Sequence, residues 1–291
     1  MYLIIGGNSF LGSYIIKNII DKTNENIIAT YYSGTPFLNN SRISWIKCDI
    51  SQTEDIQEIF SNIKNNDKSI KCIYLAGYIK PDEVEKNPHI AWKVNIGGLT
   101  KFIDICGDYL SCLYFASTDM VFSEDSSYSY SENDVPIPMN KYGELKYIAE
   151  KIVISAGFNV FRCPLMYGKS LIPNRIHFID HVEQCIKNKE YFDVLSDYYE
   201  STLDYDSVAK LLLELINKNP QGKIIHIAAD EPITKYEIAI EYAKKYNLDS
   251  SYIKPLPLDK ANFFIAKRGT VTLDNTNLKS ICNIKKIERK Y

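Results

Sequence analysis

The chain has 291 residues, of which 45% are hydrophobic and 24% are charged, and its formal net charge at pH 7 is −2. This composition excludes an intrinsically disordered chain, and the chain is long enough for one large core or two lobes. Because the Lys residues are scattered and the charge is near neutral, the sequence has no electrostatic footprint for nucleic acid.

The seven Cys form neither a Cys-x-x-Cys pair nor an even disulfide framework, which is typical of a reducing compartment. We find no charged leader with a cleavage site and no apolar run long enough to span a bilayer. We therefore expect a cytoplasmic protein that binds neither membrane nor nucleic acid.

The first half of the chain alternates short apolar runs with segments of helical periodicity. This βαβ rhythm predicts an α/β fold of the Rossmann type, a doubly wound parallel sheet covered on both faces. The apolar runs are Tyr2–Ile5, Ile27–Tyr31, Trp45–Lys47, Cys72–Leu75 and Leu113–Ala116.

The second half has a looser pattern. Residues 174–188, 204–217 and 234–246 have helical periodicity, and Lys223–Ile227 reads as a strand. We expect residues 1–163 to form the nucleotide-binding domain, with a return strand near 223–228, and residues 164–291 to form mainly a smaller substrate lobe.

A glycine-containing turn, residues 6–12, follows the first apolar run directly. Such a turn lets the backbone approach a pyrophosphate held at a helix N-terminus. Ser9 stands where the usual pattern has glycine, and its side chain would either crowd the phosphate or bind it. We expect this turn to bind the cofactor through Gly6, Ser9, Phe10, Leu11 and Gly12.

The end of the second strand selects between NAD and NADP. An acidic residue there would bind the ribose 2′-hydroxyl of NAD, but the sequence reads Thr30-Tyr31-Tyr32-Ser33-Gly34. The absence of Asp and Glu favours NADP over NAD, with Ser33 as a phosphate donor. Tyr78 and Lys80 follow the fourth strand and are candidates to line a substrate pocket.

Residues Phe115 to Glu150 carry the pattern of a hydride-transfer site. Reduction of a ketone places negative charge on its oxygen, so a proton donor must lie within hydrogen-bond reach. Tyr142 is a candidate donor, because Lys146 lies one helical turn away and its ammonium would lower the pKa of the phenol. Thr118 would add a hydrogen bond from the carboxyl end of a parallel strand.

Two Tyr-x-x-x-Lys pairs occur, Tyr142/Lys146 and Tyr147/Lys151, no more than chance predicts from this composition. The spacing alone therefore does not identify the site. Tyr142 follows a turn-rich segment that contains Pro136, Pro138 and Asn140, whereas Tyr147 lies deeper in the helix. This context favours the first pair.

Several of these motifs together resemble the extended short-chain dehydrogenase/reductases that act on nucleotide-activated sugars, and in particular the dTDP-4-dehydrorhamnose reductase branch. The residues that carry the resemblance are Ser117-Thr118-Asp119-Met120-Val121-Phe122, Tyr130-x-Glu132-x-Asp134, Pro138-x-Asn140-x-Tyr142-Gly143, Lys146, Glu150, Arg162 and Tyr167-Gly168.

The resemblance implies a role for each matching position. Thr118, Tyr142 and Lys146 would be catalytic, and Tyr142 and Lys146 would also contact the cofactor. Asp49 and Ile50 would contact adenine, and Leu75, Ala76 and Gly77 would form the nicotinamide side of the site. Asp119 and Arg268 would contact the substrate, with Arg268 at its diphosphate. Arg162 ends an apolar strand, and we interpret it as a buried structural partner.

The reaction type depends on the residue after Asp119. Dehydratases of this family have an Asp-Glu pair there, but this chain has Met120, which disfavours elimination of water. The sequence thus predicts NAD(P)H-dependent reduction of a 4-keto nucleotide sugar in deoxysugar or polysaccharide biosynthesis. A nucleotide-sugar epimerase and a non-catalytic NAD(P)-binding regulatory subunit remain alternatives, and monomer and homodimer are both open. His177 and His181 lack a third ligand motif, so we expect no metal.

Overall fold

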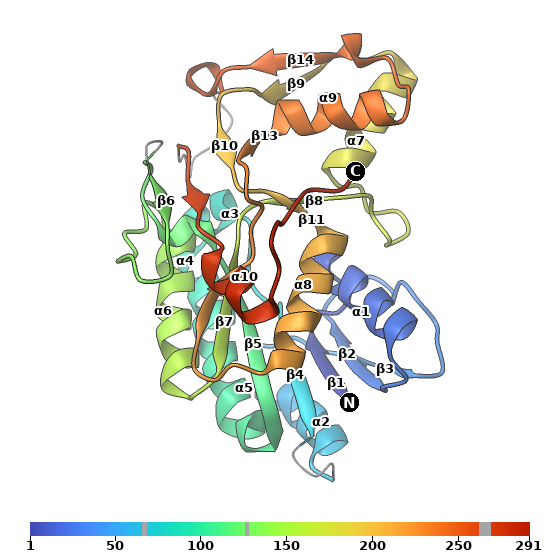
Figure 1. Cartoon of the computed structure of the whole chain (residues 1–291). Coiled ribbons are helices and arrows are strands. Elements are labelled where there is room, and N and C mark those ends of the chain that lie inside the picture. Colours follow the sequence, from blue (N-terminus) through green and yellow to red (C-terminus); the bar gives the residue numbers. More distant parts are fainter. Residues whose placement is uncertain (66–68, 126–127, 262–268) are drawn as a thin grey trace.

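The computed structural model describes residues 1–65, 69–125, 128–261 and 269–291. Its centre is a parallel seven-stranded sheet with the strand order β12-β7-β5-β4-β1-β2-β3 (Figure 1). The Rossmann-type fold expected from the sequence is confirmed. The strands are β1 (Tyr2–Ile5), β2 (Ile27–Tyr31), β3 (Ile43–Lys47), β4 (Ile70–Tyr74), β5 (Leu110–Thr118), β7 (Asn159–Cys163) and β12 (Ile224–His226).

Helices cover both faces of this sheet, which is why its strands are apolar on both sides. Along β1, Tyr2 and Ile4 pack into one core, while Leu3 and Ile5 pack into the other. This alternation follows from the two-residue repeat of a strand. The first face is covered by α1 (Phe10–Lys22), α8 (Tyr205–Lys218) and α10 (Thr276–Cys282), and the second by α2 (Thr53–Ile63), α5 (Leu99–Cys106) and α6 (Lys141–Ser155).

The strand order reverses at β1, which pairs with β2 on one side and with β4 on the other. In open α/β sheets the crevice at the carboxyl ends of the strands, at such a switch point, is where ligands bind. The turn after β1 and the segments after β4 and β5 therefore meet at one edge of the sheet.

A second lobe lies beyond one end of the sheet (Figure 1). Its strands β9 (Phe192–Leu195) and β14 (Ile253–Leu256) pair in parallel. Helices α7 (Phe178–Asn188) and α9 (Lys235–Lys245) pack on them around a separate apolar cluster. The helix predicted from residue 174 begins only at Phe178, because Asn174 adopts a left-handed φ of 60° and His177 is the N-cap.

The remaining elements are short. They are α3 (Pro81–Lys86), α4 (Pro88–Trp92), the π-helix η1 (Lys93–Gly98), the 3₁₀ turns η2 (Gly107–Tyr109), η3 (Asp119–Val121), η4 (Ser250–Tyr252) and η5 (Leu258–Lys260), and the strands β6 (Ser129–Tyr130), β8 (Met166–Tyr167), β10 (Tyr199–Glu200), β11 (Leu203–Asp204), β13 (Ile233–Thr234) and β15 (Thr272–Leu273). Within the described ranges, no helix has the length and apolar character needed to cross a bilayer.

Candidate active site

Two cavities meet at the carboxyl edge of the sheet. The first, of about 510 Å³, lies over β1, β2 and β4, and the second, of about 590 Å³, lies between the sheet and the second lobe. Ile79 lines both. A ligand that fills the first cavity would therefore approach a ligand in the second near Ile79.

The glycine turn borders the first cavity through Gly6 and Ser9. Gly6 has a φ of +89°, which favours glycine, and its amide donates to Thr30 Oγ1 at 2.8 Å. Ser9 is the N-cap of α1, and its hydroxyl accepts from the Gly12 amide at 3.0 Å. Ser9 thus caps the helix, a role that the sequence alternatives of crowding or binding a phosphate did not include. Phe10 and Leu11 follow at the first helical positions, where amides have no intrahelical partner.

The ends of β2 and β3 form the outer wall of the first cavity, with Ser33, Asp49 and Ile50 in its lining. Burial acts to raise the pKa of Asp49, but hydrogen bonds from Ser51 and Gln52 outweigh burial and lower that pKa. Helix α2 has Gln52 as its N-cap, so Asp49 does not cap this helix. The lowered pKa favours an ionised carboxylate at neutral pH in a residue that lines the first cavity.

The segment after β4 forms the opposite wall with Leu75, Ala76, Gly77 and Tyr78. Asn95 fixes it, since Oδ1 accepts from the Tyr78 amide at 2.6 Å and Nδ2 donates to the Tyr78 carbonyl at 3.1 Å. Tyr78 thus lines the first cavity, whereas Lys80 lines the second.

Helix α6 is joined to the end of β5 by contacts around Gly143. A Cβ at Gly143 would lie 2.1 Å from the Met120 carbonyl oxygen, so only glycine permits this approach. Asn140 caps the helix by accepting from the Gly143 amide at 2.9 Å. These contacts bring Tyr142 to the segment of Thr118, whose hydroxyl donates to Asp119 Oδ1 at 3.1 Å.

Lys146 points from α6 into the sheet edge. Its Nζ donates to the Ala116 carbonyl at 2.8 Å and lies 4.6 Å from the Phe115 ring centroid and 5.9 Å from that of Tyr142. Burial, opposed by the charge of Glu150, lowers the pKa of Lys146 to about 8. The arrangement places a phenol beside a buried ammonium, on a helix bonded to the strand that ends at Thr118.

The second Tyr-x-x-x-Lys pair lies elsewhere on α6. Tyr147 packs against the cluster that contains Val121 and Phe122, and Lys151 Nζ lies 4.8 Å from the Tyr147 ring centroid. Tyr147 and Lys151 do not line either cavity as the structure describes them.

A buried ion pair joins α6 to β7 beside these residues. Arg162 donates through Nε and Nη2 to both carboxylate oxygens of Glu150, at 2.8 and 2.7 Å, and Glu150 also accepts from Ser117 Oγ. Arg162 and Glu150 are 1% and 0% exposed. His226 Nε2 lies 3.3 Å from Arg162 Nη1. The sequence interpretation of Arg162 as a buried structural partner is confirmed.

The catalytic candidates and the cavities are adjacent but distinct. Within the described part of the chain, the linings include neither Thr118, Tyr142 nor Lys146, although Met120 lines the second cavity. Asp119 is 1% exposed. The remaining predicted substrate residue, Arg268, lies outside the described residues.

The sequence interpretation missed several lining residues as ligand contacts, among them Arg175 at the first cavity and His177 and Lys235 at the second. Burial lowers the pKa of His177 to about 4, and its Nε2 lies 2.9 Å from Tyr205 Oη. His181 instead packs against the Phe192 ring. No local motif marks Arg175 or Lys235 as a ligand contact. Arg175 reaches its cavity through a contact with Asn8, which is distant in the sequence.

A Rossmann-type sheet with a glycine turn at its switch point and a second lobe beside it is typical of nucleotide-binding α/β enzymes. The family described as the RmlD substrate binding domain matches residues 1–290, and the chain belongs to this family.

The chain is also similar to three known proteins. Methionine adenosyltransferase 2 subunit beta of Xenopus laevis is 30% identical over 190 residues, which are 63% of this chain and 57% of that protein. The probable low-salt glycan biosynthesis reductase of Haloferax volcanii is 24% identical over 87% of this chain and 83% of its own length. The structure of dTDP-4-dehydrorhamnose reductase from Bacillus anthracis in complex with NADP has a TM-score of 0.77 at 21% identity, and the match covers 96% of this chain and 92% of that one. The last similarity is one of fold.

Proposed function

We propose that this protein is an NAD(P)H-dependent reductase of a 4-keto nucleotide sugar similar to dTDP-4-dehydrorhamnose, in deoxysugar or polysaccharide biosynthesis. The observation that carries the proposal is the approach of α6, which bears Tyr142 and Lys146, to the end of β5, which bears Thr118. Family membership and the reductase among the relatives support it.

The first cavity would hold the dinucleotide. The amides of Phe10 and Leu11 at the start of α1 would bind its pyrophosphate, aided by the turn of Gly6, Ser9 and Gly12. Asp49 and Ile50 would contact adenine, and residues 75–77 would flank the nicotinamide. Ser33 and the absence of an acidic residue at the end of β2 favour NADP over NAD. When bound, the nicotinamide supplies the hydride.

The chain's own residues would manage the proton and the reacting oxygen. Tyr142 would donate its phenolic proton to the keto oxygen as negative charge develops there. The Lys146 ammonium would favour the phenolate that remains and would bind the nicotinamide ribose. The Thr118 hydroxyl, which donates to Asp119 Oδ1 in this structure, would turn to donate a second hydrogen bond to the same oxygen.

The second cavity would hold the sugar. Lys80 lines this cavity and Asp119 lies beside Met120 at its wall, whereas Tyr78 would contribute from the adjoining first cavity. Arg268 is proposed at the diphosphate from the sequence resemblance alone. Met120 in place of a second carboxylate disfavours dehydration. We further propose the division into a nucleotide-binding domain (1–163, with the return strand) and a substrate lobe (mainly 164–291), and a location in the cytoplasm.

The test is the loss of 340 nm absorbance when the purified protein meets NADPH or NADH together with a dTDP-4-keto-6-deoxy sugar. Oxidation that depends on the sugar would support the reductase and give its cofactor preference. Conversion of the sugar without net oxidation of added cofactor would instead identify an epimerase. Cofactor binding with neither reaction would contradict both enzymatic assignments for this substrate.

The similarity to methionine adenosyltransferase 2 subunit beta favours one further candidate, a regulatory subunit that binds NAD(P) without turning it over. It predicts that the protein changes the activity of a partner enzyme and that replacement of Tyr142 has no effect on that change. Size-exclusion chromatography with light scattering would determine whether the isolated protein is a monomer or a homodimer.

A further inference from the structure

The first cavity, which would hold the cofactor, is lined by two cations among its described residues, Lys93 and Arg175. The charge of Lys93 acts on Asp49 and helps to lower its pKa, which places Lys93 on the Asp49 side of the cavity. Arg175 lies at the glycine turn instead. It comes from the loop between β8 and α7, far along the chain from the nucleotide-binding motifs.

The position of Arg175 is built by contacts on both sides of it. Tyr14 Oη, from α1, donates to the Lys169 carbonyl at 2.8 Å, and the ring of His177 lies 4.5 Å from that of Phe10. Between these anchors, Asn174 takes a left-handed φ of 60° and the Arg175 amide donates to the Ile172 carbonyl at 3.3 Å. The loop is thus fixed to the first helix at each end and turns tightly before Arg175.

The guanidinium of Arg175 lies over the turn itself. Nη1 donates to the Asn8 carbonyl at 2.6 Å, and the guanidinium carbon lies 4.8 Å from the Phe10 ring centroid. Asn8 in turn donates from Nδ2 to the Thr35 carbonyl at 3.2 Å. Arg175 therefore lies beside the start of α1, and the Asn8 side chain links this turn to the loop that follows β2, while Arg175 as a whole stays exposed.

A cation at this point has a clear chemical use. Ser9 Oγ accepts from the Gly12 amide, so that amide is engaged by the protein. A dinucleotide carries a diphosphate, and NADP carries a further phosphate on its 2′-hydroxyl. Guanidinium binds phosphate through parallel N–H donors, which makes Arg the residue suited to either group.

We propose that Arg175 binds a phosphate group of the dinucleotide and so joins the substrate lobe to the bound cofactor; this inference rests on the proposed function. The phosphate is either the diphosphate or the 2′-phosphate of NADP, because Asn8 lies between the helix start and the β2 loop. A loop of the second half of the chain would then complete the cofactor site of the first half.

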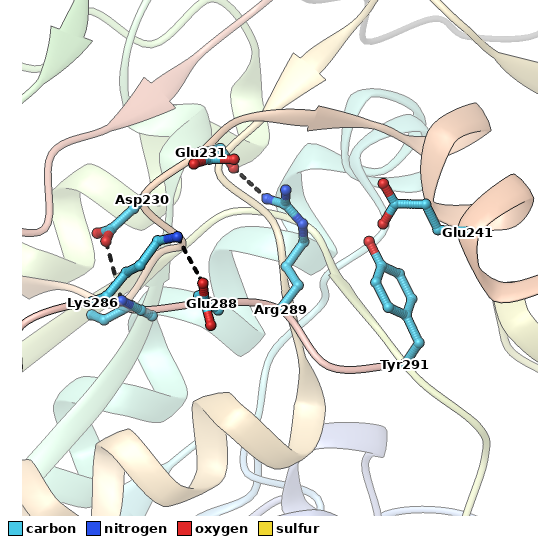
Figure 2. A pocket seen from close by; sticks show the side chains of 8 residues that line it. Asp230, Glu231, Glu241, Lys286, Glu288, Arg289 and Tyr291 are labelled. Carbon is cyan, nitrogen blue, oxygen red and sulfur yellow. Dashed lines mark hydrogen bonds and ion pairs between the residues drawn. The ribbon is translucent and has the colours of Figure 1, made fainter. Parts of the chain in front are cut away.

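The test measures the dissociation constants of NADPH and NADH by fluorescence titration for the wild type and for Arg175→Gln. Arg289→Gln is the matched control, since this Arg donates to the Glu231 carbonyl in a separate pocket near the chain end (Figure 2). We expect Arg175→Gln to weaken binding by about 10-fold or more, as for loss of a charge-assisted hydrogen bond, and Arg289→Gln to leave binding within about twofold. Arg175→Lys, which keeps the charge without the planar donors, should fall between them.

The pattern of loss identifies the phosphate. Equal weakening of NADH and NADPH assigns Arg175 to the diphosphate, and weakening of NADPH alone assigns it to the 2′-phosphate. Unchanged affinity for both, with a wild-type melting temperature, overturns the inference and leaves the proposed function intact. If Arg175→Gln has a lowered melting temperature, the binding of adenosine, which has no phosphate, is measured as well. Unchanged adenosine binding would show that the variant has lost a phosphate contact and that its cavity is intact. Wild type that binds neither dinucleotide would refute the cofactor assignment under the proposed function and this inference with it.

Discussion

Lys146 on α6 donates a hydrogen bond to the carbonyl oxygen of Ala116 on β5, with 2.8 Å between Nζ and oxygen. Ala116 lies two residues before Thr118, where β5 ends. The bond therefore fixes the helix that carries Tyr142 to the strand that carries Thr118. It also holds a buried ammonium at the edge of the sheet where the proposed chemistry occurs.

The two Tyr-x-x-x-Lys pairs provide a matched comparison. We expect Tyr142→Phe to lower kcat by about 100-fold or more, because general acid catalysis contributes this much, while cofactor affinity stays within a few-fold. Tyr147→Phe removes the same hydroxyl five residues further along α6, on the face that packs against Val121 and Phe122, and should retain activity. Steady-state NADPH oxidation by both variants decides; a fully active Tyr142→Phe would refute the site assignment.

The low pKa of Lys146, about 8 rather than 10.5, predicts opposite effects of alkaline pH on activity and stability. Reduction should decline as the pH rises through 8, because the ammonium is lost. Between 8 and 10.5 the unfolded chain binds more protons at this group, so the Lys146 contribution to folding stability increases with pH. A kcat profile and thermal melts over this window measure both, and Lys146→Met should abolish the activity. An activity profile that stays flat to pH 9.5 would contradict the proposed role.

Gly143→Ala should disrupt the approach of α6 to β5, since the new Cβ would lie 2.1 Å from the Met120 carbonyl oxygen. We expect a loss of about 1–3 kcal/mol in the free energy of unfolding and a fall in kcat, as Tyr142 moves from Thr118. Gly97→Ala, in η1, meets no atom within 4 Å and serves as the control. Urea denaturation and turnover measurements on both variants give the difference. Equal stability and equal kcat in the two variants would show that the close approach at Gly143 supports neither folding nor activity.

Breaking the buried Glu150–Arg162 pair should be costly because it leaves a charge unpaired in the core. We expect Glu150→Gln to lower the free energy of unfolding by about 3–5 kcal/mol. Asp21→Asn, which breaks the pair with Lys17 in which both side chains are 52% exposed, should cost under about 1 kcal/mol. Chemical denaturation measures both, and similar small losses would exclude a supporting role for the buried pair.

His226 should make the fold sensitive to acid. Burial first, and then the charge of Arg162, lower its pKa from 6.5 to about 3. Between these values the unfolded chain takes up a proton that the folded protein excludes, so the stability present above pH 6.5 is lost as the pH falls. His226→Gln should reduce the slope of melting temperature against pH from 7 to 4. An identical slope in the variant would show that His226 does not cause the acid sensitivity.

The sequence by itself determined the strands of the central sheet and the helices between them, but not the short strands of the second half of the chain. Apolar runs separated by helical periodicity predict the parallel sheet, because both periods follow from local backbone geometry. The helix expected from Asn174 begins late, since a single left-handed residue is not visible in periodicity. The predicted positions of Gly6, Ser33, Asp49 and residues 75–77 at one cavity follow from another local rule, that parallel strands end at a common edge.

The sequence context favours Tyr142/Lys146, but only the tertiary structure shows what each pair packs against: Lys146 donates to the Ala116 carbonyl, whereas Tyr147 packs against Val121 and Phe122. Likewise, a hydrogen bond within the turn made Ser9 a helix cap. The contact between Arg175 and Asn8 joins residues 167 positions apart in the chain. Such contacts depend on how the second half of the chain folds back onto the first, and no local pattern encodes that packing.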